Sequence, residues 1–473
     1  MSALEKASNV TAELSKFAAD AQFGTLSSAV ISQCKLLILD CLGNQIGAYG
    51  NKAATLVYEA AECRGHVGPS TIVGWGSKAT PMLAALVNGT LAHTLDMDDA
   101  HRDALTKTGS AITPAAMAVA ESVSASGAEV IAAVVAGYEV MIRLGLAVNP
   151  SHRQRGFHST ATLGTFGAAV TAGRLMRLSP EQMISAIGIA GTQAAGLVAF
   201  INNPSMIKAF NVGRAVKSGV LAATLASKGF IGPPDILEGQ EGFLKAYADS
   251  TNITVLTTAL GDEYHLLECG FKPHAACRYA HGPIDAALAL MSTHGFGGED
   301  VDAIDVHVSE LAYRQSHFYE PKNVSSAQGS TPFSVASGIT QRVASLTYKD
   351  INAAFQDQDT WNLHRRITMH VDRHMDYMGR GCRIVVRLKT GKSHEAVVPL
   401  PRGEPENPMS AEEVQSKFWS QVVPTLGEQK AAMIKSAIDR LELQSTVAPI
   451  MTNVGTSCAP RDLELSQTMR VCG

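Results

Sequence analysis

Several features that define common classes of protein are missing from this sequence. The 473 residues include eight cysteines, but no C-x-x-C pair occurs, so neither structural zinc nor a disulfide framework is expected. Lys and Arg number 39 against 43 Asp and Glu, without a polybasic run, which argues against a nucleic-acid-binding surface. No G-x-G-x-x-G motif follows a predicted strand, so a dinucleotide cofactor is not expected either.

The sequence also lacks a clear targeting or membrane segment. The first twenty residues include Glu5, Glu13 and Asp20 and no continuous apolar run, so we expect a cytoplasmic protein. The longest uncharged stretch, residues 182–207, contains several polar residues, glycines and a proline. A buried helix explains this stretch better than a membrane span, and no membrane association is expected.

The first 265 residues have the pattern of a helical domain. Apolar residues recur at three- and four-residue spacing, and small residues favour close helix packing. Thr80-Pro81, Thr113-Pro114 and Ser179-Pro180 each place a capping hydroxyl before a proline, which predicts three helix starts. A chain of this length is too long for one simple core, so a second domain should follow.

The pattern changes after about residue 270. Residues 304–308 and 384–388 alternate between apolar and polar, and an apolar run follows at 396–400, which predicts a half-buried antiparallel sheet. The capping-box sequence that starts at Ser410 then begins a helical segment that extends through Leu443. We therefore predict a mainly α protein with an α+β part: a large all-helical domain (1–268), a smaller α+β lid domain (269–404), and C-terminal helices (405–473) that complete the helical domain.

Residues 93–103 form an acidic segment with two histidines. Such a cluster after an apolar helix suits proton transfer, because burial and neighbouring charges shift the pKa values of carboxyl groups. A solvated helix end explains the same composition. Metal binding by Asp96, Asp98 and Asp99 is a further alternative, although the spacing does not match a known calcium loop.

Cationic and imidazole groups gather at three other places. His158 precedes a helix of small residues, Lys208 is a rare charge in a long apolar context, and residues 272–281 hold Lys272, Arg278 and His281. A buried lysine needs a carboxylate or an anionic ligand. Because no glycine-rich phosphate loop accompanies these groups, they fit a small polycarboxylate better than a phosphate.

A succession of motifs along nearly the whole chain resembles the MmgE/PrpD family. The motifs are Leu39-Asp40-Cys41-Leu42-Gly43, Asn88-Gly89, Leu95-Asp96-Met97-Asp98-Asp99, Gly156-Phe157-His158, Leu163-Gly164, Lys208 with Gly213-Arg214-Ala215, Lys272-Pro273, and Cys277-Arg278-Tyr279. The family includes 2-methylcitrate dehydratase, cis-aconitate decarboxylase and iminodisuccinate epimerase. The resemblance implies a homodimer whose active site lies between the helical domain and the lid and needs no metal or other cofactor.

The resemblance also implies roles for particular residues. Asp96 and His158 match the family's acidic and histidine motifs, and Lys208 and Lys272 match its substrate-binding lysines. Two departures stand out: Ala100 replaces the threonine of decarboxylase-like members, and Lys107 replaces a histidine that most members have. The predicted catalytic residues are Asp96, His158, Lys107 and His101, and the predicted substrate-binding residues are Lys208, Lys272, Arg278, His281 and Gln328.

The predicted function is that of a lyase. It would act on a small di- or tricarboxylate by proton transfer next to a carboxylate, as a dehydratase or a decarboxylase does. Epimerisation of a dicarboxylate such as iminodisuccinate uses the same kind of step and is the alternative within the family. Ala100 and Lys107 leave open a second alternative, a binding protein without catalysis.

Overall fold

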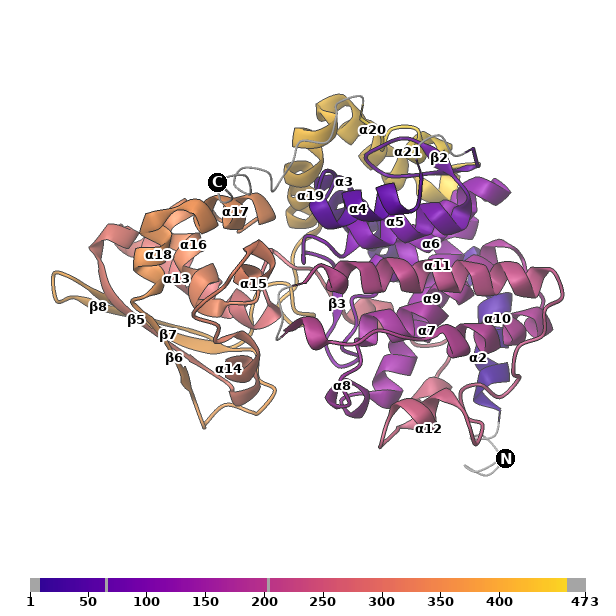
Figure 1. Cartoon of the computed structure of the whole chain (residues 1–473), viewed down its shortest axis with the longest axis horizontal. Helices are drawn as coiled ribbons and strands as arrows, with labels where there is room; N and C mark the ends of the chain where they lie inside the picture. The colour runs from indigo at the N-terminus through magenta and orange to yellow at the C-terminus, as the bar shows by residue number, and fades with distance from the viewer. Residues whose placement is uncertain (1–8, 64–66, 202–204, 457–473) are drawn as a thin grey trace, which may run out of the picture.

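The computed structural model of the chain has two lobes, one helical and one built around a small sheet (Figure 1). It describes residues 9–63, 67–201 and 205–456. The larger lobe contains the N-terminal helices and the C-terminal ones, and the smaller lobe contains the middle of the chain. This agrees with the predicted fold class, mainly α with an α+β part.

The helical lobe is formed by long helices that pack on one another with few charges between them. Its helices are α2 (Val10–Asp20), α3 (Ser28–Gly47), α4 (Lys52–Ala60), α5 (Pro81–Ala92), α6 (Gly109–Val123), α7 (Gly127–Val148), α8 (Ser151–Gln154), α9 (Ser159–Leu175), α10 (Pro180–Gln193), α11 (Ile207–Ser227) and α12 (Phe243–Tyr247). The short strands β1 (Ser70–Thr71) and β2 (Lys78–Ala79) form a hairpin before α5. Helix α7 is long and apolar enough to cross a membrane, but 94% of its most apolar window is buried inside the fold.

Small residues let α11 approach its neighbours closely, and this sets the position of its first turn. A Cβ atom on Gly213 would lie 2.2 Å from Oγ1 of Thr90 in α5, and one on Gly219 would lie 2.6 Å from the carbonyl oxygen of Thr165 in α9. Any larger side chain at either position would push α11 away. The packing therefore fixes the N-terminal end of α11, where Lys208 lies.

Two of the three predicted helix starts are confirmed, and one is wrong. Thr80 and Ser179 cap α5 and α10 with their side chains, and Ser179 forms a full capping box with Gln182. Pro114, by contrast, lies inside α6, which begins at Gly109. The carboxylate of Asp99, which lies outside the helix, accepts a hydrogen bond from the N–H of Gly109 and so marks the start of the helix. Pro114 has no N–H group, and its place inside the helix costs one internal hydrogen bond.

The smaller lobe consists of a four-stranded sheet and six helices. The strands are β5 (Val301–Val308), β6 (Ile367–Val371), β7 (Cys382–Leu388) and β8 (Ser393–Val398), in the order β6-β5-β7-β8. The helices are α13 (His281–His294), α14 (Glu310–Ser316), α15 (Val324–Gln328), α16 (Thr331–Gln341), α17 (Tyr348–Gln356) and α18 (Gln358–His364). The antiparallel pairing predicted for residues 304–308 and 384–388 is present between β5 and β7, but β6 pairs with β5 in parallel. The helical crossover α14–α18 between β5 and β6 makes that direction possible.

The chain returns to the helical lobe through α19 (Ala411–Leu426), α20 (Glu428–Asp439) and α21 (Ala448–Met451). Lys417 of α19 forms a buried ion pair of 2.6 Å with Asp40 of α3, and its ammonium group also donates to the carbonyl oxygen of Met97, 2.5 Å away. Gln421, one turn further on, donates to Asn44 of α3. These contacts brace the acidic segment from behind.

The buried pair between Lys417 and Asp40 leads to a prediction about stability. Lys417→Met leaves the Asp40 carboxylate buried without its cation, which should lower the free energy of unfolding by about 3–5 kcal/mol near pH 8. The deficit should shrink as the pH falls, because burial already raises the pKa of Asp40 and protonation removes the unpaired charge. Denaturant unfolding at several pH values measures both effects.

Lys435→Met is the matched control for that measurement. Its ion pair with Asp439 also measures 2.6 Å, but both side chains are partly exposed, so we expect a change within about 0.5 kcal/mol. Equal losses for the two variants would show that the pair with Asp40 does not brace the fold.

Candidate active site

The centre of the candidate site is the loop between α5 and α6, which carries Asp96. Asp96 has a φ of +56°, a left-handed conformation that is uncommon for a residue other than glycine. Strain of this kind gathers at functional sites because the surrounding structure has to hold it in place. Here the conformation directs the Asp96 carboxylate towards two lysines.

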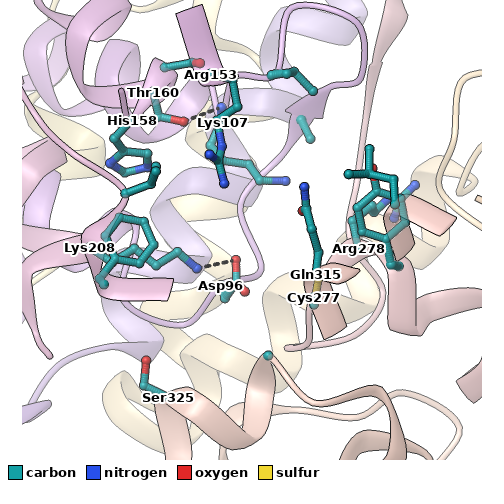
Figure 2. Close-up of a pocket in the computed structure, with 18 of the residues that line it drawn as sticks. Asp96, Lys107, Arg153, His158, Thr160, Lys208, Cys277, Arg278, Gln315 and Ser325 are labelled. Carbon is teal, nitrogen blue, oxygen red and sulfur yellow. Dashed lines mark hydrogen bonds and ion pairs between the residues drawn. The ribbon is translucent and has the colours of Figure 1, made fainter. Parts of the chain in front are cut away.

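The two lysines come from different parts of the chain. Nζ of Lys208, in the first turn of α11, lies 3.0 Å from Oδ1 of Asp96 (Figure 2). Nζ of Lys272, on the segment that leads into the smaller lobe, lies 3.1 Å from the same oxygen, and it also donates to the backbone carbonyl of Asp96. One carboxylate is therefore shared by two ammonium groups, which leaves an excess of positive charge.

The pKa values of these three groups depend on burial and on one another. Burial raises the pKa of Asp96, but the charges of Lys208 and Lys272 outweigh it and hold this pKa well below its usual range. Burial lowers the pKa of Lys208, yet the pairing with Asp96 gives a net increase. Burial, reinforced by the charge of Lys208, lowers the pKa of Lys272. At neutral pH the Asp96 carboxylate is thus ionised, and it is shared by the two lysines.

These groups face a cavity of about 750 Å³ that lies between the two lobes. From the helical lobe its wall includes Asp96, Lys107, His158 and Lys208, and from the segment entering the other lobe it includes Lys272. Helix α14 contributes Gln315, which points into the cavity in Figure 2. The volume would hold a small polycarboxylate with room to spare.

His158 stands at the N-cap of α9, where its ring lines the cavity. Its backbone N–H donates to the carbonyl of Gly196, while Nδ1 is buried and has no hydrogen-bond partner among the described residues. Burial, and then the neighbouring His93 and Lys208, hold the pKa of His158 well below its ordinary value. The ring is therefore neutral near pH 7 and is available as a base.

Lys107 lies at the end of the same loop as Asp96. Its backbone N–H donates to Oγ1 of Thr160 in α9, and among the described residues no hydrogen bond or ion pair to Nζ is found. Burial and the charge of Lys272, partly offset by Asp98 and Asp96, lower the pKa of Lys107 to about 7. The ammonium and amine forms of Lys107 are thus close in free energy at neutral pH, as acid–base catalysis requires.

The other acids of the loop lie behind the cavity wall. Asp98 accepts a hydrogen bond of 2.6 Å from Nδ1 of His93, and both side chains are fully buried. Burial raises the pKa of Asp98, but His93 outweighs it and lowers the value to about 2. Asp99 accepts hydrogen bonds from the backbone of Gly109 and from Tyr138, and burial together with Asp40 and Asp98 raises its pKa to about 8. Asp99 therefore holds the start of α6 rather than a ligand.

The remaining predicted residues occupy less accessible places. His101 borders the cavity, but both of its ring nitrogens are engaged, Nδ1 with the N–H of Ala104 and Nε2 with Glu268. Arg278 also borders it, with its guanidinium bound to the buried carboxylate of Glu404 at 2.8 Å.

The structure does not place His281 and Gln328 on the cavity wall. His281 is wholly buried and donates to the carbonyl of Ala276. The amide of Gln328 donates to the carbonyls of Leu95 and Ala275. The contact with Leu95 ties the acidic segment to the smaller lobe. Gln328 therefore positions this segment and does not reach the cavity.

The cavity wall includes further residues that were not among the predicted site residues, for example His93, Arg153 and Gln315. His93 was visible as one of the two histidines of the acidic segment, and its distance of five residues from Asp98 was the available signal. Arg153 belongs to a basic run that reads as solvated surface. Gln315 has no distinguishing signal, because its place on the wall depends on how the smaller lobe, which carries α14, lies against the helical lobe.

One group among the described residues has the spacing of a metal site. The ligand atoms of His101, His265 and Glu268 lie within 4.8 Å of one another. The backbone N–H of Ala104 donates to Nδ1 of His101, 3.2 Å away, so the neutral ring carries its proton on Nε2 and donates it to Glu268, 3.0 Å away. A metal at Nε2 would need the opposite tautomer, and the cluster therefore fits a hydrogen-bonded network better than an ion.

Comparison with known proteins agrees with the architecture and the motifs. Over 94% of its length the chain is 27% identical to the cis-aconitate decarboxylase-like protein oryM of Aspergillus oryzae and 26% identical to the cis-aconitate decarboxylase of Aspergillus terreus, covering 96% and 95% of those proteins. Over 56% of each chain it is 31% identical to the human cis-aconitate decarboxylase. Residues 12–256 match the MmgE/PrpD N-terminal domain and residues 274–443 match the MmgE/PrpD C-terminal domain, and the chain thus belongs to the MmgE/PrpD family.

Proposed function

We propose that this protein is a lyase that removes CO₂ from a small unsaturated tricarboxylate of the cis-aconitate type. The observation that carries the proposal is the sharing of the Asp96 carboxylate by Lys208 and Lys272 in a cavity between the lobes. The surplus positive charge suits an anion with several carboxylates. The names of the relatives favour decarboxylation among the reactions of the family.

The two lysines act first on the substrate carboxylates. Each has a single ion-pair partner, Asp96, among the described residues, so each can turn part of its hydrogen bonding towards a bound anion. As CO₂ leaves, negative charge spreads towards the carbon next to a second carboxylate. Fixed ammonium groups stabilise that charge because they are in place before it develops.

Lys107 and His158 divide the proton transfers between them. The bond to the departing carboxyl group breaks, its electron pair forms a new double bond, and the electrons of the old double bond take a proton at carbon. Lys107 in its ammonium form supplies that proton, since its pKa is about 7. His158, which is neutral, takes the proton of the departing carboxyl group if that group binds in its acid form.

The same pair of groups supports one alternative reaction. In a dehydration a base removes the proton next to a carboxylate and an acid protonates the departing hydroxyl group. A neutral His158 and a partly charged Lys107 on one cavity wall would serve for this. Dehydration of a hydroxylated tricarboxylate such as 2-methylcitrate is accordingly the second candidate.

Proton NMR in D₂O distinguishes these reactions. The chelator-treated protein is incubated separately with cis-aconitate, citrate and 2-methylcitrate. We expect cis-aconitate to lose CO₂ and to gain one deuteron at carbon, without added metal. Loss of water from a hydroxy acid with cis-aconitate untouched would favour the dehydratase, and no reaction of the folded protein with any of the three would contradict the proposal.

A further inference from the structure

Two neighbouring imidazoles in the site each have a buried ring nitrogen without a partner. The nitrogens are Nε2 of His93 and Nδ1 of His158, and neither has a hydrogen bond among the described residues. The ring centres lie 5.5 Å apart with the planes tilted by 31°. An unsatisfied buried polar atom costs free energy, so two of them side by side call for an explanation.

The Asp98 carboxylate determines which nitrogen of His93 carries the proton. Because Asp98 accepts from Nδ1 at 2.6 Å, a neutral His93 must have its lone pair on Nε2. In this neutral form, His93 is an acceptor at the atom that lacks a partner. Nδ1 of His158 is the complementary donor if His158 carries its proton there.

We propose that His93, oriented by Asp98, is the positioning partner of His158. The ring of His93 would accept the Nδ1 proton of His158, and the lone pair of His158 Nε2 would then face the cavity. This inference rests on the proposed function, since it gives His158 the form that a base requires. It extends that function by naming two residues, His93 and Asp98, that act through His158.

The arrangement of Asp98, His93 and His158 also accounts for the proton that His158 takes up. When Nε2 of His158 accepts a proton from the substrate, the Nδ1 proton moves to Nε2 of His93, and the ionised Asp98 stabilises the resulting imidazolium. No bond other than N–H changes, and the return transfer restores the starting state. The structure shows no direct hydrogen bond between the two rings, and catalytic hydrogen bonds commonly tighten when substrate binds.

Other charges around His158 do not provide an equivalent partner. The charged and titratable groups that surround its ring are His93, Asp96, Asp98, Lys107, Arg153 and Lys208. Lys107, Arg153 and Lys208 offer only donors when charged, and a donor cannot receive the Nδ1 proton. Asp96 is occupied by Lys208 and Lys272. His93 is the group that combines an acceptor atom, burial and a fixed tautomer.

A purely structural role for His93 and Asp98 predicts different behaviour. Such a pair would brace the acidic loop, and its loss would lower stability without changing the tautomer of His158. The matched control is a second His–Asp pair, His274 with Asp285 of the smaller lobe at 2.9 Å, in which the imidazole is buried and the carboxylate is partly exposed. This imidazole also accepts a hydrogen bond from a backbone N–H. Neither of these residues lines the cavity.

The test compares Asp98→Asn and His93→Gln with Asp285→Asn. Nitrogen-15 NMR of the histidine rings, with His158 identified by its absence in His158→Gln, reports the tautomer without any substrate. We expect His158 to carry its proton on Nδ1 in the unmodified protein and to change to the Nε2 tautomer in Asp98→Asn. The kcat of Asp98→Asn and His93→Gln should fall by at least about 10²-fold, with KM changed only a few-fold.

Each outcome supports or overturns the proposed role of His93. The Asp285→Asn control should keep the Nδ1 tautomer of His158 and a kcat within a few-fold of the unmodified protein. An unchanged tautomer and an unchanged pH profile of kcat in folded Asp98→Asn and His93→Gln would overturn the inference. If the unmodified protein reacted with none of the acids, the proposed function would fail, but the tautomer measurement would still decide the role of His93.

Discussion

Lys272→Met should lower kcat/KM by about 10²–10³-fold, the loss expected when one fixed group that stabilises a developing charge is removed. Lys272 is the most buried cation of the site, with 1% of its side chain exposed, and it contacts Asp96 at 3.1 Å. Without it, Asp96 and Lys208 form a neutral pair, and the surplus positive charge for the substrate disappears. The measurement is steady-state kinetics with the carboxylic acid that reacts in the NMR experiment. We expect a raised KM as well as a lowered kcat.

The control for Lys272→Met is a variant that restores the local charge in another way. In Lys272→Met combined with Asp96→Asn, the cavity keeps one net positive charge on Lys208 and loses the buried carboxylate. This double variant should unfold at a temperature close to that of the unmodified protein while its activity stays low. If Lys272→Met alone lost its fold and the double variant regained both fold and activity, Lys272 would be a structural counter-ion of Asp96 and not a substrate-binding group.

Asp96, Lys208 and Lys272 show how much of the candidate site could be predicted from the sequence. Asp96 lies 112 positions before Lys208 and 176 positions before Lys272, and their motifs predicted one site for all three. Their contacts confirm that they meet, because two lysines in apolar surroundings need a carboxylate. The left-handed backbone of Asp96 could not be foreseen, since no glycine or turn motif marks it.

The less accurate part of the site prediction concerns residues 272–281. Lys272, Arg278 and His281 lie close together in the sequence and suggested a single cationic patch. In the structure, Arg278 forms an ion pair with Glu404, which comes from the segment that returns to the helical lobe and is also bound by Arg380 at 2.8 Å, and His281 faces the interior. A partner 126 residues away leaves no local signal, so the sequence could not show that Arg278 already has a carboxylate partner.

The fold was easier to predict where local signals decide the structure. Capping side chains fixed the starts of α5 and α10, because they satisfy backbone N–H groups within the same turn. The start of α6 depends instead on Asp99, ten residues earlier in a loop. Strand β6 was not predicted, although residues 367–371 alternate between apolar and polar, and its parallel pairing with β5 depends on the long crossover between the two strands.

Lys107→Met should reduce kcat by about 10²–10⁴-fold, the range for a group that transfers a proton in the transition state. In Lys107→His the imidazole titrates in the same region of pH, so this variant should recover much of the loss. Lys107→Arg keeps the positive charge but cannot release a proton near neutral pH. It should therefore be as inactive as Lys107→Met, which separates proton transfer from simple attraction of the substrate.

The pH dependence of kcat/KM is a second test of Lys107 as the group that supplies the proton. Lys107 acts as an acid only as the ammonium form, and burial beside Lys272 lowers its pKa to about 7, so kcat/KM should be highest below pH 7 and fall as the pH rises through 7. A bound polycarboxylate favours the ammonium form and raises this pKa. The descending limb of kcat should accordingly lie at a higher pH than that of kcat/KM, because the two parameters report the complex and the free enzyme. Activity that rises through pH 7 would instead make Lys107 the base, and a profile unchanged in Lys107→His and Lys107→Arg would exclude it from proton transfer.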